Sequence, residues 1–257
     1  MIDAMPVPSP MIAAAALGVL GAIVGSFIAA LVIRWPQDRS VVRGRSACDA
    51  CGRTLTAIDL VPLVSALLLR GRCRSCGAQI DPLHWRIEAC GLGIGIAAGL
   101  VAPGQAALWG AAFGWLLLAL AALDLVAFWL PDRLTLLLAL GGAAGGVAGL
   151  APDVLDRLIG GVAGFALLWA IAAGYRRIRG HDGMGGGDPK LFGAIGLWLG
   201  WQMLPAVLVI ASLVGLGVAL FARLIGRRMS GDTAMPFGAL LAVAAYPAWI
   251  AMIVSTS

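Results

Sequence analysis

The sequence predicts an all-α membrane protein with about eight transmembrane helices and a small cytoplasmic zinc-binding insert after the first helix. Hydrophobic residues make up 61% of the chain and charged residues 12%, roughly half the charged share of an ordinary soluble domain. The apolar residues gather in runs that approach the roughly 20 residues that a helix needs to cross a bilayer. Four of the five cysteines lie in one arginine-rich segment between the first two runs. This composition excludes a soluble globular protein.

Apolar runs and charge clusters predict eight spans. They are expected at about 11–33, 87–102, 106–124, 133–150, 158–175, 190–203, 205–222 and 234–254. The sixth is short and Pro205 follows it closely, so a tilted or partly buried helix is expected there. The first span ends in Arg34-Trp35-Pro36, which is typical of a stop-transfer flank and not of a signal-peptide cleavage site.

The distribution of basic residues predicts the orientation, because Lys and Arg collect in short cytoplasmic loops. Nine of the 18 basic residues lie in the segment after the first span: Arg34, Arg39, Arg43, Arg45, Arg53, Arg70, Arg72, Arg74 and Arg86. That segment is therefore expected in the cytoplasm. With eight spans, the remaining clusters fall on the same side and only Arg157 falls on the other. Both termini are expected outside.

Three parts follow from this topology: a first transmembrane helix at 1–33, a cytoplasmic zinc-binding insert at 34–86 and a transmembrane bundle at 87–257. The insert carries the chain's net charge of +5. Anionic lipid headgroups would attract it, so membrane lipid is the expected partner and nucleic acid is not.

Four cysteines predict a metal site. Cys48 and Cys51 form one Cys-x-x-Cys-Gly motif, Cys73 and Cys76 form another, and 21 residues separate the pairs. This spacing suits a tetrahedral four-thiolate zinc site, which would stabilise an insert too small to form much core. Two disulfides, which need an oxidising compartment, and a redox or iron site are the alternatives. The fifth cysteine, Cys90, lies in an apolar run and is expected to be buried.

The segment between the cysteine pairs is unusually apolar. Residues 58–69 read IDLVPLVSALLL, which Pro62 interrupts and which is too short to span a membrane. It is expected to pack on the membrane surface or against the bundle. His84 and His181 have no partner at ligand spacing and are expected to be polar loop residues.

Two aspartates at the edges of apolar runs are the candidate catalytic residues. Asp124 follows the run 106–123, and Asp188 closes a glycine-rich loop just before another run. Carboxylates at such boundaries are costly, so they indicate function. Asp132 follows Pro131 at an expected helix start and is interpreted as structural.

A close pair of carboxylates cannot both ionise, and could provide one general base toward water and one general acid toward a peptide carbonyl. The glycine-rich loop fits this chemistry, since irregular backbone at membrane depth is tolerated only where protein or a wet cavity surrounds it. The alternative is that each aspartate only caps a helix.

The chain resembles the bacterial type IV prepilin peptidases, bifunctional leader peptidases and N-methyltransferases of the GxGD class of aspartic proteases. The resemblance rests on the cysteine motifs and on GSFIAALVIRWP at 25–36, DLVPLVSALLLRGRC at 59–73, LDLVAFWLPDRLTL at 123–136 and GMGGGDPKLFGAIGLWLGW at 183–201. It implies catalysis by Asp124 and Asp188, zinc at Cys48, Cys51, Cys73 and Cys76, and S-adenosylmethionine as methyl donor.

The resemblance also implies prepilin or pseudopilin substrates and a place in the bacterial inner membrane, with the insert and both aspartates on the cytoplasmic side. Glu88 aligns with a glutamate often seen after the insert, and Val126 stands where many relatives have a second aspartate. A proton- or cation-coupled transporter that uses the two aspartates is the alternative function, and a zinc-anchored assembly factor is a third.

Overall fold

The computed structural model describes residues 9–41, 45–226 and 235–256. The chain forms two compact units, Met1–Ala119 and Leu120–Ser257. Every regular element in the described ranges is a helix, and the only extended pairings there are two isolated bridges in the insert. The all-α prediction is therefore confirmed for these residues.

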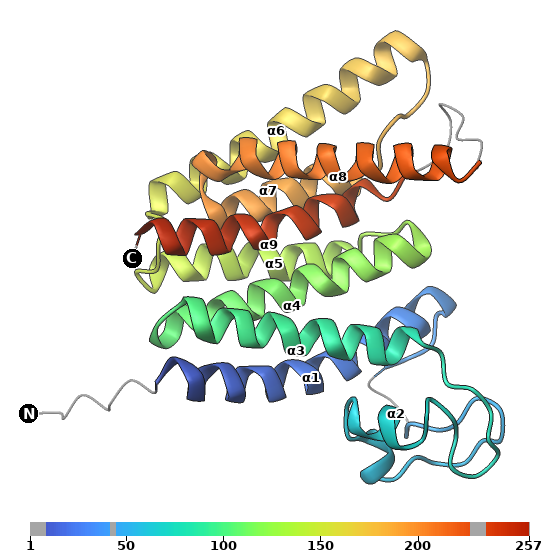
Figure 1. The fold of residues 1–257 in the computed structure, drawn as a ribbon. Helices are drawn as coiled ribbons and strands as arrows, with labels where there is room; N and C mark the ends of the chain where they lie inside the picture. The colour runs from blue at the N-terminus through green and yellow to red at the C-terminus, as the bar shows by residue number, and fades with distance from the viewer. Residues whose placement is uncertain (1–8, 42–44, 227–234, 257) are drawn as a thin grey trace, which may run out of the picture. The chain divides into compact units, whose positions relative to one another are not determined.

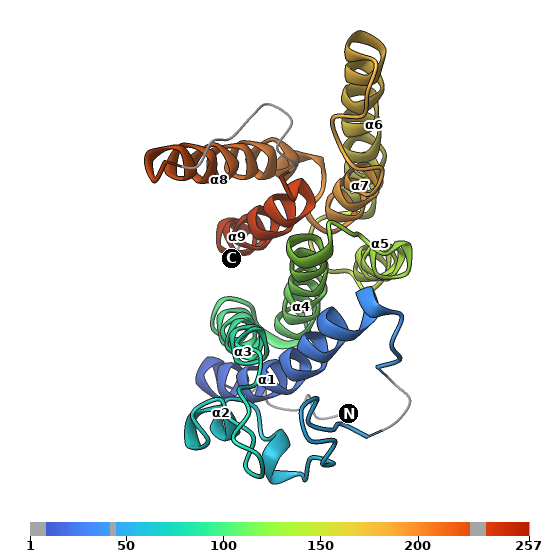
Figure 2. The same ribbon diagram turned by 90° about the vertical axis from the view of Figure 1, so that its right-hand side faces the viewer.

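The first unit is built on two long antiparallel helices. Its elements are α1 (Pro10–Arg34), η1 (Trp35–Gln37), η2 (Ile58–Leu60), α2 (Val64–Leu68), α3 (Leu83–Val101) and the first part of α4 (Gly104–Ala127). Helices α1 and α3 lie side by side (Figures 1 and 2). A Cβ added at Gly21 would collide with the carbonyl oxygen of Gly91, so this close approach requires glycine. The indole of Trp115 donates to the same carbonyl at 3.0 Å.

The second unit contains the end of α4 and five further long helices. These are α5 (Asp132–Val147), α6 (Val154–Arg179), α7 (Gly187–Leu199), α8 (Leu204–Leu224) and α9 (Phe237–Thr256), with η3 (Trp201–Met203) before α8. Helix α7 is almost wholly buried and packs against α5, α6 and α9. Its side chains Leu191, Phe192, Ile195 and Leu199 form the centre of this unit's core.

Arg157 ties together α5, the loop after it and the end of α7 in the second unit. Its side chain is 3% exposed, and its guanidinium donates to the carbonyl oxygens of five residues: Gly142, Leu150, Ala151, Pro152 and Leu197. These carbonyls belong to α5, the loop after it and the end of α7. The one basic residue that the sequence-based topology leaves off the cytoplasmic side thus has a structural role, which gives a physical reason for its exception to the charge rule.

All eight apolar runs contain helices, but eight spans are not confirmed. Five helices in the described ranges are long and apolar enough to cross a membrane: Pro10–Gln37, Gly104–Ala127, Val154–Arg179, Trp201–Leu224 and Phe237–Thr256. Helix α3 carries Arg86 and Glu88, while α5 and α7 have only 16 and 13 residues. Length and charge therefore set these three apart from a standard span of about 20 residues.

Candidate functional site

The four predicted metal ligands converge. The Sγ atoms of Cys48, Cys51, Cys73 and Cys76 all lie within 4.8 Å of one another, and those of Cys48 and Cys76 are 3.9 Å apart. Zinc–sulfur bonds of about 2.3 Å in a tetrahedron place neighbouring sulfurs about 3.8 Å apart, whereas a disulfide needs about 2 Å. The cysteines are free. The cluster could hold a metal ion, and the sulfur spacing does not fit two disulfides.

Each cysteine pair folds into the same tight turn. The N–H of Gly52 donates to the carbonyl of Cys48, and that of Gly77 donates to the carbonyl of Cys73, both at 2.9 Å. Both glycines have a φ of +70°, which a side chain would strain. The backbone N–H groups of Cys76 and Ser75 point at the Cys73 sulfur and lower the pKa of that thiol to about 6. Although the backbone N–H of Ala78 opposes the rise, burial and the neighbouring cysteines raise the pKa of Cys76 to about 11. A thiolate is the form that binds metal.

Asp59 links the two cysteine turns. Its carboxylate pairs with Arg53 at 3.1 Å and with Arg74 at 3.2 Å, and these arginines follow Cys51 and Cys73 in sequence. Arg53 also donates to the Ser75 hydroxyl at 2.7 Å. Hydrogen bonds from Thr56, and then the two arginines, lower the pKa of Asp59. The structure thus pairs both arginines with one carboxylate between the two cysteine turns.

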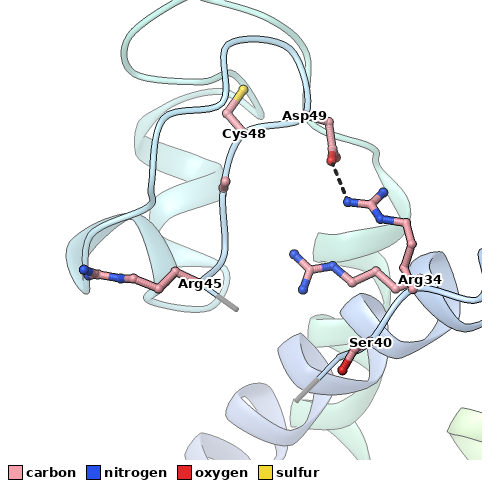
Figure 3. A pocket seen from close by; sticks show the side chains of 7 residues that line it. Arg34, Ser40, Arg45, Cys48 and Asp49 are labelled. Carbon is pink, nitrogen blue, oxygen red and sulfur yellow. Dashed lines mark ion pairs between the residues drawn. The ribbon is translucent and has the colours of Figure 1, made fainter. Parts of the chain in front are cut away.

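A basic hollow lies beside the first cysteine turn (Figure 3). Its volume is about 510 Å³, and Arg34, Arg39 and Arg45 line it together with Cys48 and Asp49. Arg39 pairs with Asp49 at 3.5 Å across a largely exposed surface. Arg45 lines the same hollow as Cys48.

The two candidate catalytic aspartates lie together in the second unit. Asp124 lies near the end of α4 and Asp188 in the first turn of α7, and each is 5% exposed. A Cβ built on Gly238 would lie 3.1 Å from Oδ2 of Asp124 and 3.0 Å from Oδ1 of Asp188. Those two oxygens therefore cannot be farther apart than the sum of these distances. The pairing expected from the sequence is present.

The start of α9 is a third part of this site, and sequence reasoning missed it. The backbone N–H of Ala239 donates to Oδ2 of Asp124 at 2.7 Å. Gly238 lies between the carboxylates, where a side chain would also collide with Leu130. The available signal was the Pro236-Phe237-Gly238 sequence, which places a proline and a glycine at the start of the last apolar run.

The aspartates open onto a hollow of about 840 Å³. The glycine-rich loop 183–187 forms one wall of the hollow. The apolar side chains that line it are Phe128, Trp129, Leu130, Tyr175, Met235 and Phe237. Gly183 lies against the Tyr175 ring, where even a methyl group would collide. The loop thus places backbone polar groups and aromatic surface beside two carboxylates.

Comparisons with known proteins agree with this geometry. The model of the Bacterial Peptidase A24 N-terminal domain matches residues 19–101, and that of the Type IV leader peptidase family matches residues 111–220. The chain is 39% identical to a prepilin leader peptidase/N-methyltransferase of Aeromonas hydrophila, over 81% of this chain and 71% of that protein. The chain belongs to the type IV leader peptidase family.

Further members of this family share more of the chain. A protein of the same name from Burkholderia pseudomallei (strain K96243) is 37% identical over 87% of this chain and 81% of its own length. One from Pseudomonas aeruginosa is 34% identical over 91% of this chain and 88% of its own length. No solved structure matches the chain. These relatives support the resemblance found in the sequence and give the transporter alternative no support.

The remaining singled-out residues lie outside the two clusters. Asp132 opens α5 and pairs with Lys190 at 2.7 Å, which agrees with a structural role. His84 and His181 join no cluster of potential metal ligands in the part of the chain that the structure describes. His181 lies in a loop, as expected, but His84 lies in the first turn of α3, so the prediction of a loop residue is wrong for it. Cys90 is exposed on α3, so the prediction of a buried thiol is wrong. A helix that faces lipid can expose an apolar residue at no cost, and for this reason apolar sequence alone does not predict burial.

Glu88 is the remaining buried acid of the first unit. It is 7% exposed, and its Oε2 accepts the backbone N–H of Leu63 at 2.8 Å. Leu63 directly precedes α2, and its φ of +61° is unusual for a residue with a side chain. The carboxylate therefore fixes the start of α2 against α3.

Proposed function

We propose that Asp124 and Asp188 are the catalytic pair of a membrane aspartic endopeptidase that removes the leader from type IV prepilins or pseudopilins. The observation that carries this proposal is the approach of both carboxylates to Gly238. If each aspartate only capped its own helix, three separate helices would not need to bring the two carboxylates to one point. The relatives, whose printed name is prepilin leader peptidase/N-methyltransferase, support this substrate class.

The geometry suits a shared-proton mechanism. Two adjacent buried carboxylates hold one proton between them, because a second negative charge there is unfavourable. The ionised carboxylate takes a proton from water as the water attacks the scissile carbonyl, and the protonated one donates to that carbonyl oxygen. The resulting tetrahedral intermediate collapses to a carboxylic acid and a new N-terminal amine.

The hollow provides for an extended substrate. A peptide inside a bilayer needs partners for its N–H and C=O groups, and the non-helical loop 183–187 offers backbone groups beside the carboxylates. Phe128, Trp129 and Tyr175 offer apolar surface to the hydrophobic segment that follows the cleavage point in prepilins.

The metal held by the four cysteines is proposed to be zinc. Four thiolates at tetrahedral spacing favour it, and a structural zinc would supply folding energy to the insert. Cys48, Cys51, Cys73 and Cys76 would hold the ion, and no step of peptide cleavage is assigned to it. The metal would thus stabilise the insert in place of a hydrophobic core.

N-methylation of the new N-terminus is the second proposed activity, supported by the relatives' printed name. S-adenosylmethionine is the proposed methyl donor. When bound, it would supply an electrophilic methyl group for transfer to the N-terminal amine. No described residue carries a motif for this donor, so no residue is assigned to the step.

The proposed topology keeps eight spans in the bacterial inner membrane. In this arrangement 1–33 is the first span, 34–86 the cytoplasmic insert and 87–257 the protease bundle. The five long apolar helices support a multi-pass protein, and the arginine-rich insert supports its cytoplasmic placement. Helices α3, α5 and α7 would be the three spans that length and composition alone do not identify.

The test is mass spectrometry of a prepilin co-expressed with Asp124→Asn or Asp188→Asn. Each variant is expected to lose about 10²- to 10⁴-fold in leader cleavage, the usual contribution of a general acid or base. Asp132→Asn, whose carboxylate is 74% exposed, is the matched control and is expected to cleave normally. Supplying a leaderless pilin measures methylation separately. Unchanged cleavage by either candidate variant would remove that aspartate from the mechanism.

A further inference from the structure

The element between the two cysteine turns exposes an apolar face. Val61 lies in extended backbone shortly before helix α2, which carries exposed Val64, Leu67 and Leu68 at the three- and four-residue spacing of one helix face. Their exposed fractions are 41%, 50%, 78% and 74%. Ile58, just before them, is 63% exposed. We call these five exposed residues the apolar stripe; they lie along the segment from η2 through α2.

The opposite face of the same element turns toward the protein. Ser65, Ala66 and Leu69 are partly buried and line hollows within the first unit. Helix α2 therefore directs its serine and alanine inward and its leucines outward. A helix on a water-soluble domain shows the reverse arrangement, so water is not the solvent that this outer face fits.

A hydrogen bond fixes the depth of α2 along α3. Glu88 accepts the N–H of Leu63, the residue before α2, at 2.8 Å. Glu88 is five residues into α3, about 7.5 Å along its axis from the first residue. Trp85, one turn earlier on α3, is 43% exposed, and tryptophan favours the headgroup level of a bilayer. Helix α2 is thus held at the level where, in the proposed topology, α3 enters the membrane.

Basic residues follow the apolar stripe directly. Arg70 and Arg72 are both exposed and lie just after Leu69. Long basic side chains beside an apolar surface reach toward anionic headgroups while their stems stay in apolar surroundings. An apolar face followed by arginines is the pattern of a helix that lies in the membrane interface.

We propose that residues 58–69 form an interfacial element whose apolar face lies in the leaflet next to the insert, at the boundary of headgroups and acyl chains. The occupant of this face is lipid. The element anchors the region between the cysteine turns to the bilayer surface through Leu67 and Leu68, while Glu88 joins it to α3. This inference rests on the proposed topology of the insert and α3, and not on the peptidase mechanism.

The experiment uses the full chain in vesicles of phosphatidylcholine and phosphatidylglycerol. A photoreactive p-benzoylphenylalanine replaces Leu67 in one variant and Ala50, an exposed residue of the first cysteine turn, in the control. After illumination, mass spectrometry identifies the adducts. We expect lipid adducts at position 67 at least about tenfold above those at position 50, because only the former would lie among acyl chains.

Two results would overturn the proposal. One is equal lipid labelling at both positions, which would place the stripe outside the bilayer. The other is labelling at position 67 of a co-reconstituted prepilin in place of lipid, which would make the face a protein-docking surface. Leader cleavage by each variant, measured beforehand, shows that the chain is folded, so failure of the lipid proposal is distinguishable from failure of the protein.

Discussion

The cysteine cluster and the aspartate pair are assembled in opposite ways. All four sulfurs come from two neighbouring copies of one short turn, each closed by its own backbone hydrogen bonds. The two carboxylates come from α4 and α7, and the backbone between them comes from α9. The cysteine cluster is a local site, formed by residues close in sequence, whereas the aspartate pair forms only when helices distant in sequence pack together. We expect the local site to depend on the metal proposed for it, and the aspartate site to depend on close helix packing.

Loss of the metal should show the largest difference between the two sites, because it should unfold the insert and leave the second unit folded. In Cys76→Ser, or after chelation, we expect the insert to unfold, since structural zinc contributes on the order of 10 kcal/mol to such small folds. Limited trypsin digestion with mass spectrometry should then cut at Arg70, Arg72 and Arg74 long before it cuts the second unit. Cys90→Ser is the control, because its thiol lies outside the cluster. A metal-free protein with an equally resistant insert would contradict the expectation.

Gly238→Ala tests the packing on which the aspartate site depends. The added methyl would lie 3.0 to 3.1 Å from both carboxylates and would collide with Leu130, so the acids would have to shift. A misplacement of about 1 Å commonly costs on the order of 10²-fold in rate. We expect this loss in kcat for leader cleavage with little change in KM, since the substrate hollow remains.

Gly217→Ala is the matched control for that substitution. Gly217 lies in α8, and a Cβ there would meet nothing within 4 Å. Its cleavage kinetics should equal those of the unchanged chain. Normal kcat in Gly238→Ala would show that the carboxylates do not need glycine between them, and a rise in KM alone would indicate damage to substrate binding instead.

The same contrast explains what could be read from the sequence. The spacing of the Cys-x-x-Cys pairs predicted their convergence because each turn is determined by adjacent residues. Asp124 and Asp188 were found because ionisable groups are rare in apolar runs, but their approach depends on helix packing that no local pattern encodes. Gly238 and Ala239 escaped notice because they act through backbone position and the absence of a side chain. Asp59 was missed since a carboxylate that pairs with arginines looks, in sequence, like any loop acid.

Asp59→Asn should weaken the local site by less than metal loss does. The carboxylate bridges Arg53 and Arg74, and the amide would leave both cations without a counter-charge. We expect a lower unfolding temperature of the insert with the metal retained. Because folding lowers the pKa of Asp59, its contribution is complete above its ordinary value of about 4 and is lost as the pH falls through the lowered value. The Asp59→Asn variant should therefore not show this loss of insert stability as the pH falls. Identical unfolding curves across this range would show that the bridge does not stabilise the insert.

Lys190→Met should have the smallest effect, although Lys190 lies only two residues after Asp188. Its ammonium pairs with Asp132 at 2.7 Å, and the two side chains are 49% and 74% exposed. Exposed pairs usually contribute between 0 and about 1 kcal/mol. We expect thermal unfolding of the second unit to change within that limit and leader cleavage to stay within about twofold. A large loss of cleavage with unchanged stability would place Lys190 in the active site. The aspartate site would then depend on residues close to Asp188 in sequence as well as on helix packing.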